Sequence, residues 1–324
     1  MVAFQASQVR FADLPRAVPD VSVVMPVYNA AATLDATVAS VLAQGGCRFE
    51  LIAIDDGSSD DSLARLLSIA ARDSRIHVVG RNNRGASSAR NLGAELARAP
   101  LVAFIDADDL WAPQKLARHV LAHAQVPAAV ASYGRIGFLA PEAADLAGAH
   151  AYSALLPHTP GLTDVLRENP VATASNLVVR RAAFLTAGGF DETLSHAEDQ
   201  DLVARLIARG GVIEGVDAVL TGYRLSRQGL SRDLPAMYAG WRTVAERYLS
   251  HDARRPLEAL YCRYLARRML RAGGSPLAAL GYVRAGLRLD AASFLADRRR
   301  GLATIFAVMA GMAMPVGVRL RVFA

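Results

Sequence analysis

The chain has 324 residues, of which 52% are hydrophobic and 20% charged, so it can bury a sizeable core. Its two cysteines, Cys47 and Cys262, are too few for a disulfide framework and too far apart in the sequence for the cysteine spacing of a zinc site. They favour a reducing, cytoplasmic setting. The formal net charge of +6 suits nucleic acid, an anionic membrane surface or phosphate-bearing substrates equally well. The first residues lack the apolar stretch of a signal peptide, so we expect a protein that is not secreted.

Short apolar runs alternate with amphipathic segments in the first third of the chain. The runs predict strands over residues 21–25, 49–54, 76–79 and 101–105, each followed by a helix. Asn29 is a candidate cap for the first helix. Strands and helices that alternate in this way form βαβ units and a parallel sheet, so we predict an α/β fold.

The pattern is looser beyond residue 115. One or two strands over 130–138, a strand over 175–179 and a short helix over 181–187 are expected, with a loop region rich in small residues between 139 and 160. From Pro235 onward the pattern is helical, with a break at 273–276.

The end of the chain carries an uncharged segment, 302–318, flanked by arginines. Its length is at the lower limit for a membrane span, and Pro315 interrupts it. A helix lying at the membrane interface is one interpretation. A helix that packs on its own domain or on a second copy of the chain is the other.

Three carboxylates, those of Asp106, Asp108 and Asp109, directly follow the strand that begins at Leu101. Ligands of parallel sheets bind at the carboxyl ends of the strands, and clustered carboxylates repel one another unless a cation neutralises them. Oxygen ligands of this kind suit Mg²⁺ or Mn²⁺, especially where phosphate oxygens complete the shell. The alternative interpretation is an acidic turn before the next helix.

Three common nucleotide and phosphate motifs are absent from the sequence. No G-x-G-x-x-G turn follows the first strand, which argues against dinucleotide binding, and no G-K-[ST] of a P-loop follows any strand. The run Asp55-Asp56-Gly57-Ser58 differs from the motif of aspartate-nucleophile phosphatases, because Ile54 stands where that motif has a carboxylate.

Six segments in one order resemble the family 2 glycosyltransferases of the GT-A fold, and the resemblance covers about residues 20–232. The segments are Val24–Asn29, Ile54–Ser58, Gly85–Asn91, Phe104–Lys115, Gly188–Glu192 and Glu198–Leu202. The resemblance implies a Rossmann-like mixed sheet flanked by helices as domain 20–232, with 233–324 as a helical extension. It also implies a metal-dependent, inverting transfer from a nucleotide-diphosphate sugar, most simply a UDP-sugar, with a dTDP- or GDP-sugar as alternatives.

Site residues follow from the resemblance, position by position. It implies that the donor contacts Pro26, Tyr28, Asn29, Asp55, Asp56, Asp106, Ala107 and Glu198, with Asp55 facing the uracil ring and Asp106 the ribose. Either Arg84 or Arg90 is implied to lie near the base or the phosphates, and the resemblance leaves open which one. Asp108 and Asp109 are the implied ligands of Mn²⁺ or Mg²⁺, and Asp199 is the implied general base. A charge-favoured helix N-terminus is the structural alternative for the acidic run at 198–201.

One segment departs from the family pattern. Ser226 stands where many relatives have a histidine that contacts the phosphates, so Arg224 or Arg227 is expected to supply the positive charge instead. The predicted partners are a nucleotide-sugar donor and a glycan or lipid-linked acceptor, with membrane contact or self-association through 301–324. The expected location is the cytoplasm, at the inner face of its membrane if that contact forms. A nucleotide-sugar-binding protein without turnover is the second hypothesis, and no motif supports nucleic-acid binding.

Overall fold

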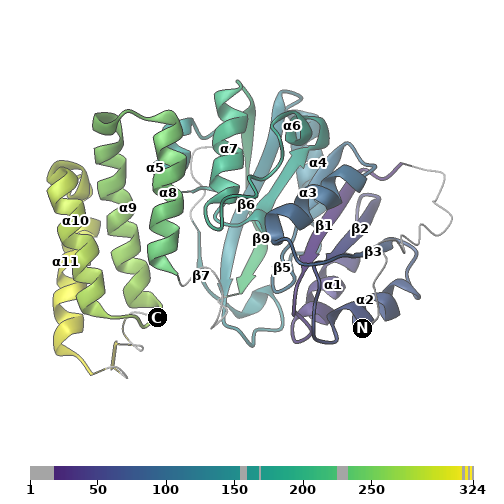
Figure 1. The fold of residues 1–324 in the computed structure, drawn as a ribbon, viewed down its shortest axis with the longest axis horizontal. Coiled ribbons are helices and arrows are strands. Elements are labelled where there is room, and N and C mark those ends of the chain that lie inside the picture. The colour runs from purple at the N-terminus through teal and green to yellow at the C-terminus, as the bar shows by residue number, and fades with distance from the viewer. Residues whose placement is uncertain are drawn as a thin grey trace. The chain divides into compact units, whose positions relative to one another are not determined.

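The computed structural model describes residues 18–153, 159–167, 169–224, 233–315, 318, 319 and 322 (Figure 1). These residues divide into two compact units. The larger unit contains the described residues up to Leu162, together with 170–193 and 198–224. The smaller one contains 163–169, 194–197 and the described residues from 233 onward. The predicted domain boundary at residue 232 stays a prediction.

A mixed sheet forms the centre of the larger unit. Its strands are β1 Val21–Val27, β2 Phe49–Asp55, β3 Ile76–Gly80, β4 Leu101–Phe104, β5 Leu110–Trp111, β6 Ala129–Leu139, β7 Ala149–Tyr152, β8 Leu177–Arg180 and β9 Val212–Arg224. They lie in the order β3-β2-β1-β4-β8-β6-β9-β5, with β7 on β6. Strands β1 to β4 are parallel, whereas β8 is antiparallel to both β4 and β6.

The first four strands lie where the apolar runs predict them. Strand β1 is buried along its whole length, and so are β2 and β4, because helices cover both faces of this part of the sheet. Helices α1 Leu34–Leu42, α2 Ser62–Ala70 and α4 Lys115–Gln125 place apolar side chains on one face. Helix α3 Ala86–Leu96 covers the other, where Gly93 lets its backbone approach Val24.

The predicted cap of the first helix is wrong. Helix α1 begins at Leu34, after Thr33, and Asn29 lies five residues earlier with φ +49°. The side-chain oxygen of Asn29 accepts hydrogen bonds from the backbone N–H and the hydroxyl of Ser59, at 2.8 and 3.2 Å. Asn29 therefore ties the loop after β1 to the loop after β2, so the carboxyl ends of these strands are held together.

The second half of the sheet differs more from the expected pattern. Residues 129–139 form one long strand, β6, which pairs in parallel with β9. Strand β9 was not predicted, and β7 lies inside the expected loop region 139–160. Short elements complete this half: η1 Leu146–Gly148, η2 Ala174–Asn176, α6 Arg181–Thr186 and α7 Glu198–Ala208.

The smaller unit is helical, as predicted. Its helices are α5 Leu162–Arg167, α8 Leu234–Tyr248, α9 His251–Arg271, α10 Pro276–Phe294 and α11 Arg298–Ala313. Side chains cap four of these helices at their N-termini. The predicted break at 273–276 is confirmed, because α9 ends at Arg271 and Pro276 starts α10. Trp241 stacks on Tyr261 and donates to the carbonyl of Leu166 at 2.7 Å.

Residues 302–313 of the uncharged segment form most of α11, and Pro315 follows the helix end. Among the helices that the structure describes, none combines the length and the apolar character that crossing a bilayer requires.

Candidate active site

The acidic loop after β4 is fixed by hydrogen bonds to its backbone. The hydroxyl of Ser175 accepts from the N–H of Asp106 at 2.9 Å. From the opposite side, the hydroxyls of Thr33 and Thr37 both donate to the carbonyl of Ala107, at 2.8 and 3.0 Å. Ala107 therefore belongs to the frame of the loop, and the carboxylates on either side of it are held at a defined place beside the strand ends.

The three carboxylates of this loop differ in exposure. Asp106 and Asp108 are partly exposed, whereas Asp109 is buried. The Oδ1 atom of Asp109 accepts from the N–H of Arg224 at 3.0 Å, and its Oδ2 has no hydrogen-bond partner among the described residues. Burial, followed by the charge of Asp106, raises the pKa of Asp108 to about 6. The pKa of Asp109 is raised well above its usual range by burial and then by Asp108 and Asp106.

Arg224 has a structural task in this arrangement. Its guanidinium donates to the carbonyls of Asp108, Pro141 and Ala143, at 2.7, 2.9 and 2.6 Å. These bonds attach the acidic loop to the segment after β6 and turn the charge towards backbone oxygens, which does not favour the predicted phosphate contact. Arg227 and Ser226 lie outside the described residues.

Arg90 of α3 joins the two acidic segments that the sequence places about 90 residues apart. Its guanidinium forms ion pairs with Asp106 and, at 3.2 Å, with Glu198 at the start of α7. Burial opposes its charge, but the carboxylates of Asp106, Glu198 and Asp199 outweigh that effect and raise the pKa of Arg90. The predicted base, Asp199, is buried and lies within the electrostatic reach of the same cation.

The glycine pair before this region makes a turn that supports Arg90. Gly189 has φ +69°, and a Cβ there would lie 2.5 Å from the side-chain oxygen of Asn91. Asn91 accepts from the N–H of Phe190 at 2.8 Å and donates to its carbonyl at 2.9 Å. The ring of Phe190 then lies 5.4 Å from the Arg90 guanidinium carbon. The Gly188–Glu192 motif therefore positions the residues that hold the acidic segments together.

Asp55 and Asp56, at the end of β2, are both buried but have different surroundings. Asp55 accepts from the N–H of Ser58 at 3.2 Å through Oδ2, while its buried Oδ1 has no hydrogen-bond partner among the described residues. Asp56 accepts from Arg81 at 2.7 Å and from the backbone N–H groups of Arg84 and Gly85. Asp56 thus organises the 81–85 loop, and Asp55 keeps an acceptor available.

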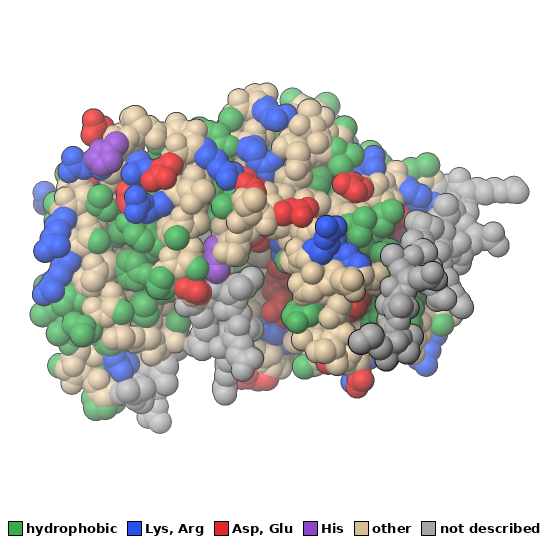
Figure 2. All heavy atoms as spheres, in the orientation of Figure 1, with side chains coloured by type: hydrophobic (Ala, Val, Ile, Leu, Met, Phe, Trp, Pro, Cys, Tyr) green, Lys and Arg blue, Asp and Glu red, His purple; other side chains and the backbone are tan. Residues whose placement is uncertain are grey.

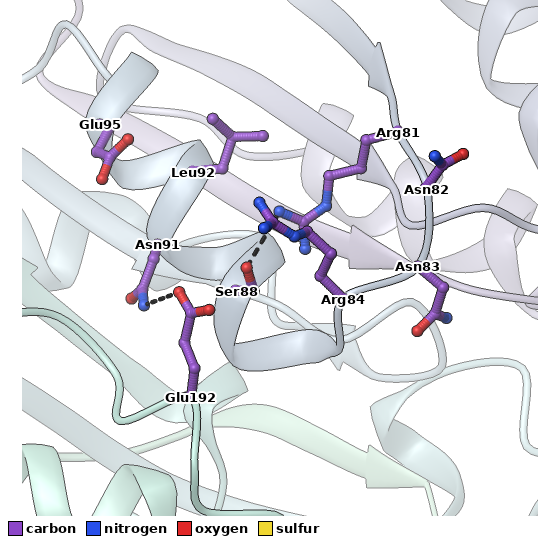
Figure 3. A pocket seen from close by; sticks show the side chains of 9 residues that line it. All are labelled: Arg81, Asn82, Asn83, Arg84, Ser88, Asn91, Leu92, Glu95 and Glu192. Atoms are coloured by element: carbon purple, nitrogen blue, oxygen red, sulfur yellow. Dashed lines mark hydrogen bonds between the residues drawn. The ribbon is translucent and has the colours of Figure 1, made fainter. Parts of the chain in front are cut away.

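A hollow of about 760 Å³ opens beside that loop, and Figure 3 shows the side chains that line it. In it, Arg81 donates to the Ser88 hydroxyl at 3.2 Å, and Asn91 donates to Glu192 at 3.0 Å (Figure 3). Arg84 is exposed, and its guanidinium makes no ion pair within the described part of the chain. This cation at the rim can therefore meet an anionic ligand.

The loop after β1 contributes three predicted contacts with different exposure. Pro26 is buried within the strand, where it pairs in register with Ile54. Tyr28 and Asn29 are exposed at the strand end. Both therefore lie at the edge of the sheet where β2 presents Asp55.

The sequence reasoning missed a buried polar cluster behind the acidic loop. Lys115, the only lysine of the chain, is fully buried. Its ammonium lies 3.3 Å from Nε2 of His119 and donates to the Thr221 hydroxyl at 3.2 Å. Ser132 then links His119 to His123. Burial lowers the pKa of Lys115 to about 7, despite the opposing effect of Asp109. One lysine among 36 basic residues was the available signal for this site.

Across the described residues, no three side chains of His, Cys, Asp or Glu converge in a way that could hold a metal ion by themselves. The structure does bring together Asp106, Asp108, Arg90, Glu198 and Asp199. Asp55 and Asp56 lie at the end of β2, which pairs with β1, and β1 pairs with β4. One edge of the sheet therefore carries carboxylates at the ends of β2 and β4, with the buried Arg90 and the exposed Arg84 near them.

Comparisons with known proteins identify relatives of the chain. The family model described as "Glycosyl transferase family 2" matches residues 22–186. The succinoglycan biosynthesis protein ExoU of Rhizobium meliloti (strain 1021) is 32% identical over 255 residues, which are 72% of each chain. TuaG of Bacillus subtilis (strain 168), a putative teichuronic acid biosynthesis glycosyltransferase, is 43% identical over 103 residues, which are 32% of this chain and 41% of TuaG.

A third relative has a more specific name. WfgD of Escherichia coli, called a UDP-Glc:alpha-D-GlcNAc-diphosphoundecaprenol beta-1,3-glucosyltransferase, is 40% identical over 97 residues, 30% of this chain and 38% of WfgD. Residues 1–349 of S. aureus TarS, solved with UDP-GlcNAc, superpose with a TM-score of 0.60 at 19% identity, covering 89% of this chain and 90% of that one. TarS 1–349 with UDP gives 0.56 at 18% identity and the same coverage. These likenesses confirm the predicted GT-A fold with its helical extension.

Proposed function

Because the chain belongs to glycosyltransferase family 2, we propose that it moves a sugar from a UDP-sugar, with inversion, to a hydroxyl of a glycan or lipid-linked saccharide. The observation that carries the proposal is Arg90, whose guanidinium binds both the acidic loop and the N-terminus of α7. The donor and acceptor classes are supported by WfgD, whose name specifies a UDP-sugar and a lipid diphosphate.

Asp55 is proposed to recognise the base of the donor. Its Oδ1 atom is buried and has no partner among the described residues, and such an orphan acceptor is costly unless a ligand N–H meets it. The N–H of a uracil ring provides that donor. Tyr28 stands exposed at the neighbouring strand end, where its ring can cover the base, and the exposed cation of Arg84 can face the anionic part of the donor.

The acidic loop is proposed to hold Mn²⁺ or Mg²⁺ together with the donor. Asp106 and Asp108 are partly exposed, and the pKa of Asp108 is raised by burial and by the charge of Asp106, so a cation would relieve their repulsion. Mg²⁺ commonly takes one or two carboxylates and completes its shell with substrate phosphates, which fits two accessible ligands. Between Asp108 and Asp109 we favour Asp108, because Asp109 is buried and bound to Arg224. When bound, the cation would supply Lewis-acid stabilisation of the departing diphosphate.

Asp199 is proposed as the general base. It lies in the first turn of α7, beside Glu198, and Arg90 connects that turn to Asp106. An acceptor hydroxyl that loses its proton to this carboxylate can attack the anomeric carbon from the face opposite the diphosphate. The C–O bond to the acceptor forms as the C–O bond to the diphosphate breaks, so a single displacement inverts the configuration. A base of this kind contributes typically about 10²–10⁴-fold.

The test is UDP release from UDP-sugars by Asp199→Asn. We expect release to fall by about 10²-fold or more, while the affinity for UDP stays within about twofold of the wild type. Asp217→Asn is the matched control, because Asp217 is a 64% exposed carboxylate whose ion-pair partner is Arg135 of β6. Full activity in Asp199→Asn would refute the base assignment. Tight UDP binding without turnover in the wild type would favour a binding protein.

A further inference from the structure

Helix α11 of the smaller unit is apolar on two sides. On one side Gly301, Thr304, Val308 and Gly311 are buried, and Val308 packs in a core with Ala259, Ala266 and Phe294. On the other side four large apolar side chains are exposed: Leu302 (46%), Phe306 (70%), Met309 (52%) and Met312 (50%). We refer to these four residues as the α11 stripe.

The spacing of the α11 stripe is that of one continuous helix face. Positions 302, 306 and 309 follow the i, i+4, i+7 pattern, and 312 lies three residues further along. The packed face already accounts for the attachment of the helix to its unit, so the fold does not need a second apolar face. Contiguous exposed apolar surface of this kind marks a surface that meets another apolar phase or partner.

Exposed arginines flank the α11 stripe. Arg298, Arg299 and Arg300 occupy the first turn of α11, where the helix dipole disfavours positive charge. Asp297 caps this turn and pairs with Arg300 at 3.3 Å, which offsets part of the cost. Helix stability therefore does not explain the three arginines. Arg284 and Arg288 are also exposed on α10, the neighbouring helix in the same unit.

The whole C-terminal segment has a strong charge bias. Residues 233–324 contain 15 arginines and six acidic residues, although the net charge of the entire chain is only +6. Figure 2 shows basic and hydrophobic side chains next to each other over the part of the surface formed by α10 and α11. The partner of this face is thus expected to combine negative charge with an apolar interior.

We propose that the α11 stripe and Arg298–Arg300 form a binding site for an anionic lipid bilayer, with α11 lying in the plane of the membrane surface. A helix with an apolar face and basic neighbours is the chemistry of interfacial binding, and α11, with 16 residues, lacks the length that crossing a bilayer requires. A second copy of the chain fits less well, because α11 contains no carboxylate that could pair with the arginines of a facing α11. The inference does not depend on the donor or the reaction.

The test uses the full chain and vesicles without donor or acceptor. Wild-type protein should float with vesicles of phosphatidylglycerol and phosphatidylcholine, and much less with phosphatidylcholine alone. Replacing Arg298, Arg299 and Arg300 with glutamine should weaken binding to the anionic vesicles roughly a hundredfold, since each removes one charge near the surface. Phe306→Ser combined with Met309→Ser should weaken it by at least about tenfold.

The matched control is Leu67→Ser, which removes a 51% exposed apolar side chain of α2 in the larger unit. It should bind vesicles as the wild type does. Equal binding by wild type and the Phe306/Met309 variant would overturn the proposal, and so would equal affinity for neutral and anionic vesicles. Self-association that the same variant abolishes, with no vesicle binding by the wild type, would assign the face to a second copy instead.

Discussion

Arg90→Met tests the bridge between the two acidic segments. Methionine keeps much of the length of the side chain and removes the charge, so Asp106 and Glu198 lose their shared partner. Removing one partner of a fully buried ion pair costs about 3–5 kcal/mol. The Arg90 side chain is 5% exposed, but those of Asp106 and Glu198 are 27% and 21% exposed, so water takes over part of their stabilisation. We therefore expect the free energy of unfolding of the larger unit to fall by about 2–3 kcal/mol.

Urea denaturation followed by tryptophan fluorescence measures this loss. The chain has two tryptophans, and Trp111 lies in the larger unit while Trp241 lies in the smaller one. A Trp241→Phe background leaves Trp111 to report on the unit that contains Arg90. The midpoint should decrease with an unchanged dependence on urea, because the variant leaves the surface exposed on unfolding the same.

The control for charge removal is Arg65→Met. Arg65 pairs with Asp35 at 2.7 Å, but the two side chains are 44% and 60% exposed, so the pair should contribute less than about 1 kcal/mol. In an Arg90→Met background, Glu198→Gln should cost less than in the wild type, because the two residues are coupled. A loss for Arg90→Met no larger than that for Arg65→Met would refute the bridging role.

Three further substitutions test individual features. Gly189→Ala should lower the free energy of unfolding in urea by about 1–3 kcal/mol, because Gly189 has a positive φ and the Asn91 oxygen would lie 2.5 Å from the new Cβ. The control Gly210→Ala, with φ +82° and open space around the new Cβ, should cost about 1 kcal/mol. Equal losses in the two variants would contradict the close contact at Gly189. Lys115→Arg should overpack the buried cluster and lower the free energy of unfolding by about 1–3 kcal/mol. The exposed control Arg118→Lys should change it little. An unchanged stability of the Lys115→Arg variant would contradict tight packing. Burial, followed by the charge of Arg180, lowers the pKa of His123 to about 4, so the unfolded chain binds that proton first as the pH falls, and stability decreases between about pH 6.5 and 4. His123→Asn should remove about 3 kcal/mol of this decrease, exposed His251→Asn should not, and identical pH profiles for both would contradict the burial argument.

The sequence predicts the parallel half of the sheet well for a physical reason. Strands β1, β2 and β4 are covered on both faces, so each is a continuous apolar run that stands out from its surroundings. Strand β9 has no such run. It contains Gly215, Asp217 and Gly222, it is only partly buried, and its pairing with β6 shifts register three times. Gly222 is explained by the side chains of Leu139 and Leu146, which approach it from other parts of the chain.

The site was predictable where chemistry is local, and less so where it depends on packing. Asp106 and Asp108 follow a strand end, and that placement favours a ligand edge, with an acidic turn as the alternative. The hydrogen bond from the N–H of Arg224 to the Asp109 carboxylate depends on the pairing of β9 with β5, which no local pattern reveals. The resemblance could offer only Arg84 or Arg90 as the arginine near the base or phosphates, because the bridge from Arg90 to Glu198 joins positions 108 residues apart.

Asp55 offers a discriminating test of base recognition. Its buried Oδ1 is the acceptor proposed for the ring N–H of uracil. Asp55→Asn replaces one of the two acceptor oxygens with an NH₂ donor. A donor cannot accept the hydrogen bond of the uracil N–H, so the preference for UDP should fall. The affinity for Mn²⁺-UDP should drop by at least about tenfold, as expected for a lost hydrogen bond to a charged group.

The most direct measurement of the central claim is calorimetric titration of the wild-type chain with UDP, GDP, dTDP and CMP, each with and without Mn²⁺. We predict that UDP binds most tightly and that its affinity increases with Mn²⁺, because Asp106 and Asp108, the proposed ligands, would leave part of the metal's shell for the diphosphate to complete. A preference for another nucleotide would keep the fold and change the donor. Binding of none of them, with or without the metal, would contradict the account of this edge of the sheet as a donor site.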